Sequence, residues 1–200
     1  MRPKVSRKDS DWPDELRGVS SIKGWLSRDA ALLLHDLAAG VSEGCIVEVG
    51  SYRGRSTLAL ARGSEHGHGV PVYAVDPHDR FVGPRGGEFG PEDRAAFFRN
   101  MARTGAYRHV RLLSTRSEVV TPGWREPVAL LWLDGDHSVE GVRRDFESWA
   151  PHLLPGCHLV LDDTDDPTLG PHHLLLELVA GEWQEVGRVD RVVHLRRSTG

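Results

Sequence analysis

Residues 46–57 read IVEVGSYRGRST, a short apolar run followed by a turn with two glycines and then a helix-forming segment. In doubly wound α/β folds the first strand ends in such a turn, and a nucleotide-like ligand binds there against the carboxyl ends of the strands. Gly50 permits a tight turn and a close backbone approach, and Gly54 lets the following helix lie near the sheet. We therefore predict a strand, a ligand-binding turn and a helix.

The spacing and charge of this turn favour one kind of ligand. The glycines are arranged as Gly-x-x-x-Gly and not as the G-x-G-x-x-G of dinucleotide binding. Glu48 precedes the turn, and a carboxylate there would repel a pyrophosphate but attract a sulfonium or an ammonium group. The sequence thus favours S-adenosylmethionine over NAD, with Ser51 and Ser56 as further candidate cofactor contacts.

Outside this turn, strand-length apolar runs alternate with helix-length segments. We predict strands at residues 45–49, 70–75, 109–113, 128–133 and 158–161, and helices at 27–39, 56–63, 91–104 and 138–153. A helix after Asp166 and two strands at 183–189 and 191–195 would follow. Alternating elements are typical of βαβ units, and continuously apolar strands indicate a sheet covered on both faces. The predicted fold class is α/β, Rossmann-like and doubly wound, with a mostly parallel sheet, an antiparallel C-terminal edge pair and helices on both faces.

Asp76 follows the second predicted strand. An acid at this place in a doubly wound fold accepts hydrogen bonds from the hydroxyls of a ribose. The alternative is a turn or helix cap before Pro77, a common place for aspartate.

Two acidic clusters follow the fourth and fifth strands: residues 133–138 read LDGDHS and residues 161–166 read LDDTDD. Carboxyl ends of neighbouring parallel strands share one edge, so we expect both clusters near the glycine turn. The repulsion between their charges would be relieved by a cation, and carboxylates with water suit Mg²⁺ or Mn²⁺. Such a cation would lower the pKa of an acceptor hydroxyl.

Asp136 or His137 could remove the proton from that hydroxyl, because histidine changes its charge near neutral pH. Structural alternatives exist for these residues: 163–166 could be a solvated loop, and Asp136 or Ser138 could cap the next helix. His172 and His173 have no acid or cysteine at ligand spacing, so we expect them on a helix surface.

Together these segments resemble the class I S-adenosylmethionine-dependent methyltransferases. Within that class they resemble small-molecule O-methyltransferases related to macrolide-sugar and aminocoumarin-sugar enzymes and to cephalosporin hydroxylase-like proteins. The matching segments are residues 46–57, 75–76 and 131–137, and the stretch from Asp145 through Pro155-Gly156 to Asp163.

The resemblance implies site residues and an acceptor. The implied cofactor contacts are Glu48, Gly50, Gly54, Asp76, Asp134 and Ser117, the last near the adenine, and the implied metal ligands are Asp134, Asp162 and Asp163. Asp136 is the implied base, and a natural-product sugar or polyol is the expected acceptor. The chain departs from the family in Cys157, where a second glycine is common, and in its short length.

The sugar-modifying relatives carry extra N-terminal and lid elements. Here residues 1–26 would form an extension that could serve as a lid, and residues 27–200 a single domain that binds S-adenosylmethionine. The glycine-rich loop at 78–90 could be a second lid over a site or a flexible surface connection.

Composition excludes several classes of protein. The chain is 39% hydrophobic and 27% charged with a net charge of −4, and its basic residues form no stripe for nucleic acid. The basic N-terminus has no apolar segment behind it, so we expect a cytoplasmic protein without a membrane partner. Cys45 and Cys157 are predicted to be buried free thiols. The expected partner is a small-molecule acceptor, and a homo-oligomer is left open.

Three alternatives remain at this level. One is a metal-independent O- or N-methyltransferase that uses His137 or Asp136 as the base. Another is a catalytically inactive, cofactor-binding partner protein. An NAD-dependent enzyme is a more distant alternative because of the glycine spacing.

Overall fold

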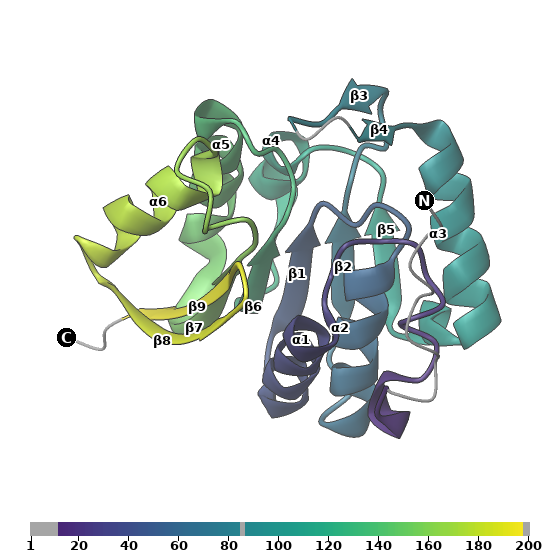
Figure 1. Cartoon of the computed structure of the whole chain (residues 1–200). Helices are drawn as coiled ribbons and strands as arrows, with labels where there is room; N and C mark the ends of the chain where they lie inside the picture. The colour runs from purple at the N-terminus through teal and green to yellow at the C-terminus, as the bar shows by residue number, and fades with distance from the viewer. Residues whose placement is uncertain (1–11, 85–86, 198–200) are drawn as a thin grey trace.

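A seven-stranded sheet in the order β5-β2-β1-β6-β7-β9-β8 forms the centre of the protein (Figure 1). The computed structural model describes residues 12–84 and 87–197. The sheet strands are β1 (Cys45–Val49), β2 (Val72–Val75), β5 (Val110–Leu113), β6 (Val128–Leu133), β7 (Leu153–Leu161), β8 (Trp183–Val189) and β9 (Val192–Arg197). The helices are α1 (Arg28–Gly40), α2 (Arg55–His66), α3 (Pro91–Thr104), α4 (Ser117–Val120), α5 (Val139–Trp149) and α6 (Gly170–Val179). The predicted fold class is confirmed.

The register of the parallel strands aligns their carboxyl ends. Val49 at the end of β1 pairs with Val75 of β2 and with Leu133 of β6, and Leu133 pairs with Leu161 of β7. The residue after each strand therefore projects from the same edge of the sheet. In Figure 1, β1 and β2 point toward this edge, where the hairpin of β3 (Phe81–Val82) and β4 (Glu88–Phe89) lies.

Two apolar cores cover the two faces of the sheet. On one face α1, α2 and α3 pack through residues such as Leu34, Leu58 and Phe97. On the other face α5 and α6 pack through residues such as Trp149 and Leu175. Alternate strand residues enter the two cores, which explains why the strands are apolar throughout.

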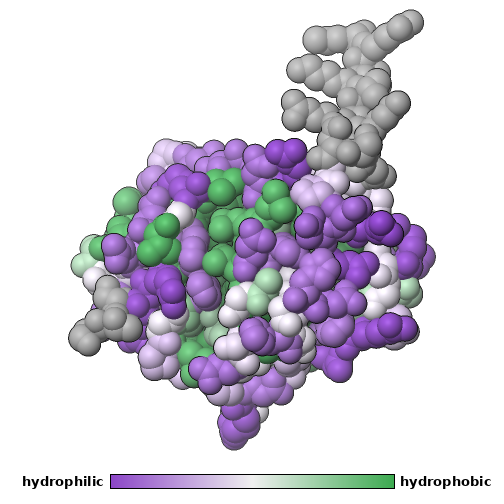
Figure 2. All heavy atoms as spheres, turned by 90° about the horizontal axis from the view of Figure 1, so that it is seen from below, coloured by the Kyte–Doolittle hydropathy of each residue, from purple (hydrophilic) through white to green (hydrophobic). Residues whose placement is uncertain are grey.

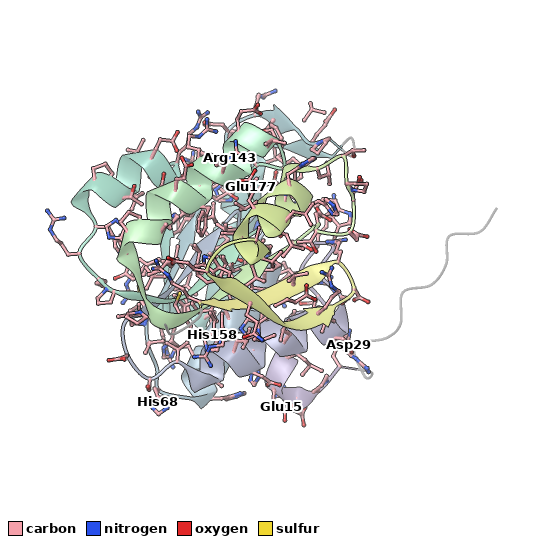
Figure 3. All side chains as sticks on the ribbon, turned by 90° about the vertical axis from the view of Figure 1, so that its left-hand side faces the viewer. Glu15, Asp29, His68, Arg143, His158 and Glu177 are labelled. Carbon is pink, nitrogen blue, oxygen red and sulfur yellow. The ribbon has the colours of Figure 1, made fainter. Side chains whose placement is uncertain are left out.

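Surface contacts link the helices of the second face. Arg143 on α5 and Glu177 on α6 point toward each other and form an ion pair (Figure 3). Figure 2 shows the molecule from below, on the side away from the β3–β4 hairpin, where hydrophilic residues surround patches of hydrophobic ones. No helix in the described ranges is both long and apolar enough to cross a membrane.

Several element boundaries differ from the prediction: β2 begins at Val72 and not at residue 70, and α2 extends to His66 and not to residue 63. The predicted helix at 138–153 ends at Trp149, followed by a 3₁₀ turn at Ala150–His152, and β7 already begins at Leu153. Pro151 lies in that turn and has no N–H to continue a helix. The loop at 78–90 also differs, since it contains the short β3–β4 hairpin.

The segment before α1 packs onto the domain. Leu16, Val19 and Ile22 are buried in the core on the α1 side. The Arg55 guanidinium donates from Nη1 to the carbonyls of Ile22 and Gly24, at 3.1 and 3.4 Å. Residues 1–11 of the predicted extension lie outside the described residues, and the division of the chain at residue 26 stays a prediction.

A buried histidine pair makes stability depend on pH. His158 on β7 (Figure 3) lies with its Nδ1 2.8 Å from the Nε2 of His194 on β9. Burial, with the nearby His158 and Arg196, lowers the pKa of His194 from 6.5 to about 4. The unfolded chain therefore binds the proton more readily, so stability is full above pH 6.5 and falls as the pH drops toward 4.

At pH 4 we expect the histidine pair to lower the free energy of unfolding by on the order of 2–3 kcal/mol relative to its value above pH 6.5. Replacing His194 with glutamine should therefore flatten the acid side of a plot of unfolding free energy against pH, measured with urea. Burial raises the pKa of Glu48 to about 7, so this residue has the opposite effect on the pH dependence of stability. Glu48 is present in both proteins, so its effect cancels in the comparison. Parallel curves for the two proteins would contradict this prediction.

Candidate functional site

A cavity of about 690 Å³ opens at the carboxyl edge of the sheet. It is bounded by the turn after β1, the ends of β2 and β6, the start of α4, the β3–β4 hairpin and the segment before α1. Of the predicted site residues, the following line it: Gly50, Ser51, Ser56, Asp76, Ser117, Asp134, Asp136, His137 and Asp163. The common rim that the sequence predicts is therefore present.

Gly50 brings the turn after β1 against the end of β6. Its φ is +84°, and a Cβ atom at this position would lie 2.1 Å from the carbonyl oxygen of Asp134. The backbones are also joined by the Asp134 N–H, which donates to the Val49 carbonyl at 2.9 Å. Both the dihedral angle and the space require glycine here.

Asp76 holds this turn in place. One carboxylate oxygen, Oδ2, accepts hydrogen bonds from the backbone N–H groups of Ser51 and Tyr52, both at 2.9 Å. The other oxygen accepts the N–H of His78 at 2.8 Å. Asp76 thus has the turn-capping role considered as an alternative, and it also faces the cavity where a ribose would lie.

Glu48 and Gly54 do not line the cavity that the described residues form. Glu48 is fully buried and accepts hydrogen bonds from the Ser56 and Thr57 hydroxyls. Burial raises its pKa to about 7 although these two hydrogen bonds act in the opposite direction. Gly54 has a φ of +89°, and a Cβ there would lie 2.6 Å from Met101 Cε. Both residues therefore support the turn from behind, and direct cofactor contact by either one stays a prediction.

Ser117 and Asp145 form a buried polar pair at the α4 and α5 side of the cavity. The Ser117 hydroxyl accepts the Trp149 indole N–H at 3.1 Å and hydrogen-bonds with Asp145. Burial raises the pKa of Asp145 to about 6, against the effect of the Ser117 hydrogen bond. The sequence predicted Ser117 but gave Asp145 no role. The position of Asp145, an acid on the face of its helix that packs against the sheet, is the feature of the sequence that could have indicated this role.

Asp134, His137 and Asp163 converge at the end of β6. His137 Nε2 lies 2.7 Å from Asp163 Oδ2 and 3.8 Å from Asp134 Oδ1. One ligand atom from each of these residues falls within a 4.8 Å span. Burial and the charges of Asp162 and Asp163 raise the pKa of Asp134 well above its usual value.

Asp162 forms a two-point ion pair with Arg191, and its predicted role as a metal ligand stays a prediction. Its two oxygens accept hydrogen bonds from Nε and Nη2 of Arg191, at 2.8 and 3.0 Å, and the same Nε lies 2.9 Å from Asp163 Oδ1. The structure brings together Asp134, His137 and Asp163, whereas the predicted trio had Asp162 in place of His137. Arg191 contacts both Asp162 and Asp163. Sequence reasoning missed Arg191, which lies in the turn between the last two strands.

Asp136 lines the cavity but also shapes the start of α5. Its Oδ1 accepts the Ser138 N–H at 2.8 Å, and the Ser138 hydroxyl accepts the Gly141 N–H at 3.0 Å as the helix cap. The capping alternatives for Asp136 and Ser138 are therefore present in the structure. A role of Asp136 as a base stays a prediction.

The cluster of Asp134, His137 and Asp163 fits a divalent cation. Two carboxylates and an imidazole nitrogen approach one another without a lysine or arginine between them, although Arg191 lies beside Asp163. The nitrogen ligand suits Mn²⁺, Fe²⁺ or Zn²⁺ better than Mg²⁺, which prefers oxygen ligands.

Comparisons with known proteins concern the family and the fold of the chain. A family model described as a methyltransferase domain matches residues 47–164. The chain is similar to the O-methyltransferase from Bacillus cereus in complex with SAH (16% identity, 98% of this chain and 94% of that chain, TM-score 0.70). It is also similar to the O-methyltransferase TomG from Streptomyces achromogenes, involved in tomaymycin synthesis and in complex with SAM (18% identity, 94% and 91%, TM-score 0.67).

A third similar structure is CalS11, a TDP-rhamnose 3′-O-methyltransferase of calicheamicin biosynthesis (18% identity, 86% of this chain and 81% of that chain, TM-score 0.63). At these identities the three structures show a common fold.

Proposed function

Because the chain belongs to the methyltransferase domain family, which matches residues 47–164 of 200, we propose that it transfers a methyl group from S-adenosylmethionine to a hydroxyl of a small-molecule acceptor. The methyltransferase predicted from the sequence is confirmed at the level of the family. The donor, the acceptor oxygen and the role of a metal belong to the proposal.

One observation supports the proposal above all others: a single cavity joins the Gly50 turn and Asp76 to Asp134, His137 and Asp163. The first pair suits the ribose and amino-acid parts of the donor. The second group offers a proton acceptor where the methyl group would be presented. The SAH and SAM complexes of similar folds are consistent with this donor.

The chemistry of the transfer can be assigned to the residues of this chain. The acceptor hydroxyl would lie at His137, and the ring nitrogen that does not face Asp163, Nδ1, would take its proton. Asp163, with an oxygen 2.7 Å from Nε2, orients the ring and stabilises its charged form. S-adenosylmethionine, held at Asp76 and the Gly50 turn, would supply the methyl group to this oxygen, and the electron pair of the broken carbon–sulfur bond would stay on the sulfur.

A second candidate is the metal-assisted form of this reaction, favoured by the close approach of three ligand atoms. Asp134, His137 and Asp163 would hold the cation, which would lower the pKa of the acceptor hydroxyl. Asp136 at the cavity wall would then take the proton. A natural-product sugar or polyol as acceptor, a cytoplasmic location and a homo-oligomer stay predictions.

Binding of the donor product tests the proposal directly. S-adenosylhomocysteine at 100 times its Kd should stabilise the native state by about 2.7 kcal/mol. For a domain of this size we expect a rise in Tm of roughly 5–10 °C. A wild-type Tm that is unchanged at millimolar ligand would end the proposal.

Asp76→Ala should abolish that rise, measured from the variant's own ligand-free Tm, because it removes the ribose acceptor and the anchor of the turn. Asp76→Asn is a milder variant that keeps one acceptor oxygen for the turn. Asp14→Ala is the matched control, since the Asp14 side chain is 95% exposed. If S-adenosylhomocysteine raised the Tm of both Asp76 variants as much as that of the wild type, Asp76 would not bind the ribose.

Removal and addition of a metal ion distinguish the metal-independent form of the reaction from the metal-assisted form. In the metal-assisted form, EDTA stops turnover, and Mn²⁺ raises the Tm of the EDTA-treated protein. Asp163→Asn should remove this rise because a neutral amide is a weaker cation ligand. Turnover that is unaffected by EDTA, together with no Mn²⁺ shift, assigns the reaction to His137 alone.

A further inference from the structure

Three aromatic rings form one wall at the mouth of the cavity. Trp25, Tyr52 and Phe89, here called the aromatic wall, come from the segment before α1, the turn after β1 and strand β4. Their ring centroids are 5.3 Å (Trp25–Tyr52), 5.2 Å (Tyr52–Phe89) and 6.0 Å (Trp25–Phe89) apart. Trp25 nevertheless remains 58% exposed. Tyr52 and Phe89 are half-buried. An aromatic surface that lines a cavity and stays partly exposed is typical of a binding site.

The aromatic wall adjoins the acidic end of the cavity. The Trp25 carbonyl accepts a long hydrogen bond from Arg191 Nη2 at 3.5 Å. Nε of the same guanidinium lies 2.9 Å from Asp163 Oδ1, and Asp163 contacts His137. His137 and the three rings line the same cavity, so one small molecule could contact both.

Tyr52 is held in the wall by an uncommon backbone conformation. Its φ is +47°, in the left-handed region that side chains other than asparagine and aspartate seldom adopt. The conformation is fixed from both sides, since the Tyr52 N–H donates to Asp76 and the Tyr52 carbonyl lies 2.8 Å from His78 Nε2. A glycine would fit this turn without strain, and an uncommon backbone conformation that places an aromatic ring at a cavity points to a functional site.

Two polar side chains beside the wall, Asp93 and Arg55, make hydrogen bonds to neighbouring protein groups, although Arg55 Nε has no partner among the described residues. Asp93 accepts from Arg53 Nε at 2.7 Å and from the Gly90 N–H at 2.9 Å. Arg55 donates to the carbonyls of the segment before α1, and Arg53 lies 5.1 Å from the Tyr52 ring centroid. A sugar ring needs several hydrogen-bond partners around its rim, whereas a flat apolar ring needs mainly aromatic surface.

We propose that the acceptor is a phenol, an inference that rests on the proposed function. The phenol ring stacks on Trp25 and Tyr52 while its hydroxyl lies at His137. This class differs from the sugar or polyol that the family resemblance implies. On transfer, the phenol proton passes to His137, the oxygen–methyl bond forms, and the bond from methyl to sulfur breaks.

Binding of paired probes to protein saturated with S-adenosylhomocysteine tests the ring preference by isothermal titration calorimetry. The probes are 2-naphthol, its saturated counterpart decahydro-2-naphthol, and methyl α-D-glucopyranoside. Aromatic contacts add to the area that a ring buries, so 2-naphthol should bind about tenfold more tightly than the saturated alcohol. The glucoside should bind more weakly than both.

Two variants locate the probe at the wall. Trp25→Leu should weaken 2-naphthol binding about tenfold and leave S-adenosylhomocysteine binding unchanged. Tyr52→Gly should also weaken 2-naphthol binding about tenfold while relieving the backbone strain. Because Tyr52 lies in the turn assigned to the donor, this affinity is measured only on protein saturated with S-adenosylhomocysteine, and the Tm shows that the variant is folded. Tyr107→Ala is the matched control, because this ring is 56% exposed and lies outside the cavity lining.

The outcomes separate the two proposals. Equal affinity for the aromatic and saturated alcohols, tighter binding of the glucoside, or unchanged 2-naphthol binding in Trp25→Leu would overturn the phenol assignment while the proposed function stands. Failure of the wild-type protein to bind S-adenosylhomocysteine in the same calorimeter would instead overturn the proposed function itself.

Discussion

Gly50→Ala should abolish cofactor binding and lower the free energy of unfolding by at least about 3 kcal/mol, because a methyl group there collides with fixed backbone. The new Cβ would lie 2.1 Å from the Asp134 carbonyl oxygen and 2.5 Å from its carbon. Neither strand can move away, since β1 and β6 are paired along their length and buried. Urea unfolding and the thermal shift with S-adenosylhomocysteine measure the two effects.

Gly69→Ala is the matched control for this prediction. Gly69 has a φ of +71°, close to that of Gly50, but a Cβ there meets nothing within 4 Å. The control therefore isolates the dihedral cost, which is about 1–2 kcal/mol. An equal loss of stability in the two variants would mean that the contact with Asp134 has no effect of its own.

The second large effect concerns turnover. His137→Gln should lower kcat by about 10²–10⁴-fold, because glutamine can neither accept the proton nor replace an imidazole ligand. The thermal shift with S-adenosylhomocysteine should remain, since the donor contacts assigned to Asp76 and the Gly50 turn are untouched. Product formation from a phenol and labelled donor, followed by chromatography, measures the change.

His173→Gln provides a histidine control outside the cavity lining, on α6, where the ring contacts the Pro167 carbonyl. It should keep kcat within about twofold of the wild-type value, as surface substitutions away from special features have small effects. Full activity in His137→Gln would leave Asp136 as the remaining candidate base.

The parallel sheet could be predicted well because its strands are buried on both faces. Such strands are continuous apolar runs, and the residues that follow them, Gly50, Asp76 and Asp134, were predicted to converge and do so. The β3–β4 hairpin could not be predicted in the same way. Its strands have two residues each, too few to show the alternation of a strand.

Side-chain partners were less predictable than strand ends. The side chain of Glu48 is buried, and its carboxylate accepts hydrogen bonds from the Ser56 and Thr57 hydroxyls. It therefore does not line the cavity. Arg191 is 29 residues from Asp162 along the chain, and no local pattern relates the two. Ion pairs between distant segments depend on the final packing, which the order of residues alone does not reveal.

The turn between β8 and β9 links distant parts of the chain. The Ser27 hydroxyl donates to Asp190 at 2.6 Å across 163 positions, and Arg191 reaches the Trp25 carbonyl across 166. Contacts of such long range form late, when chain-closure entropy has been overcome. Until the β8–β9 turn is in place, Asp162 and Asp163 lack their arginine partner, so the electrostatic balance of the cavity depends on the assembly of segments far apart in the chain.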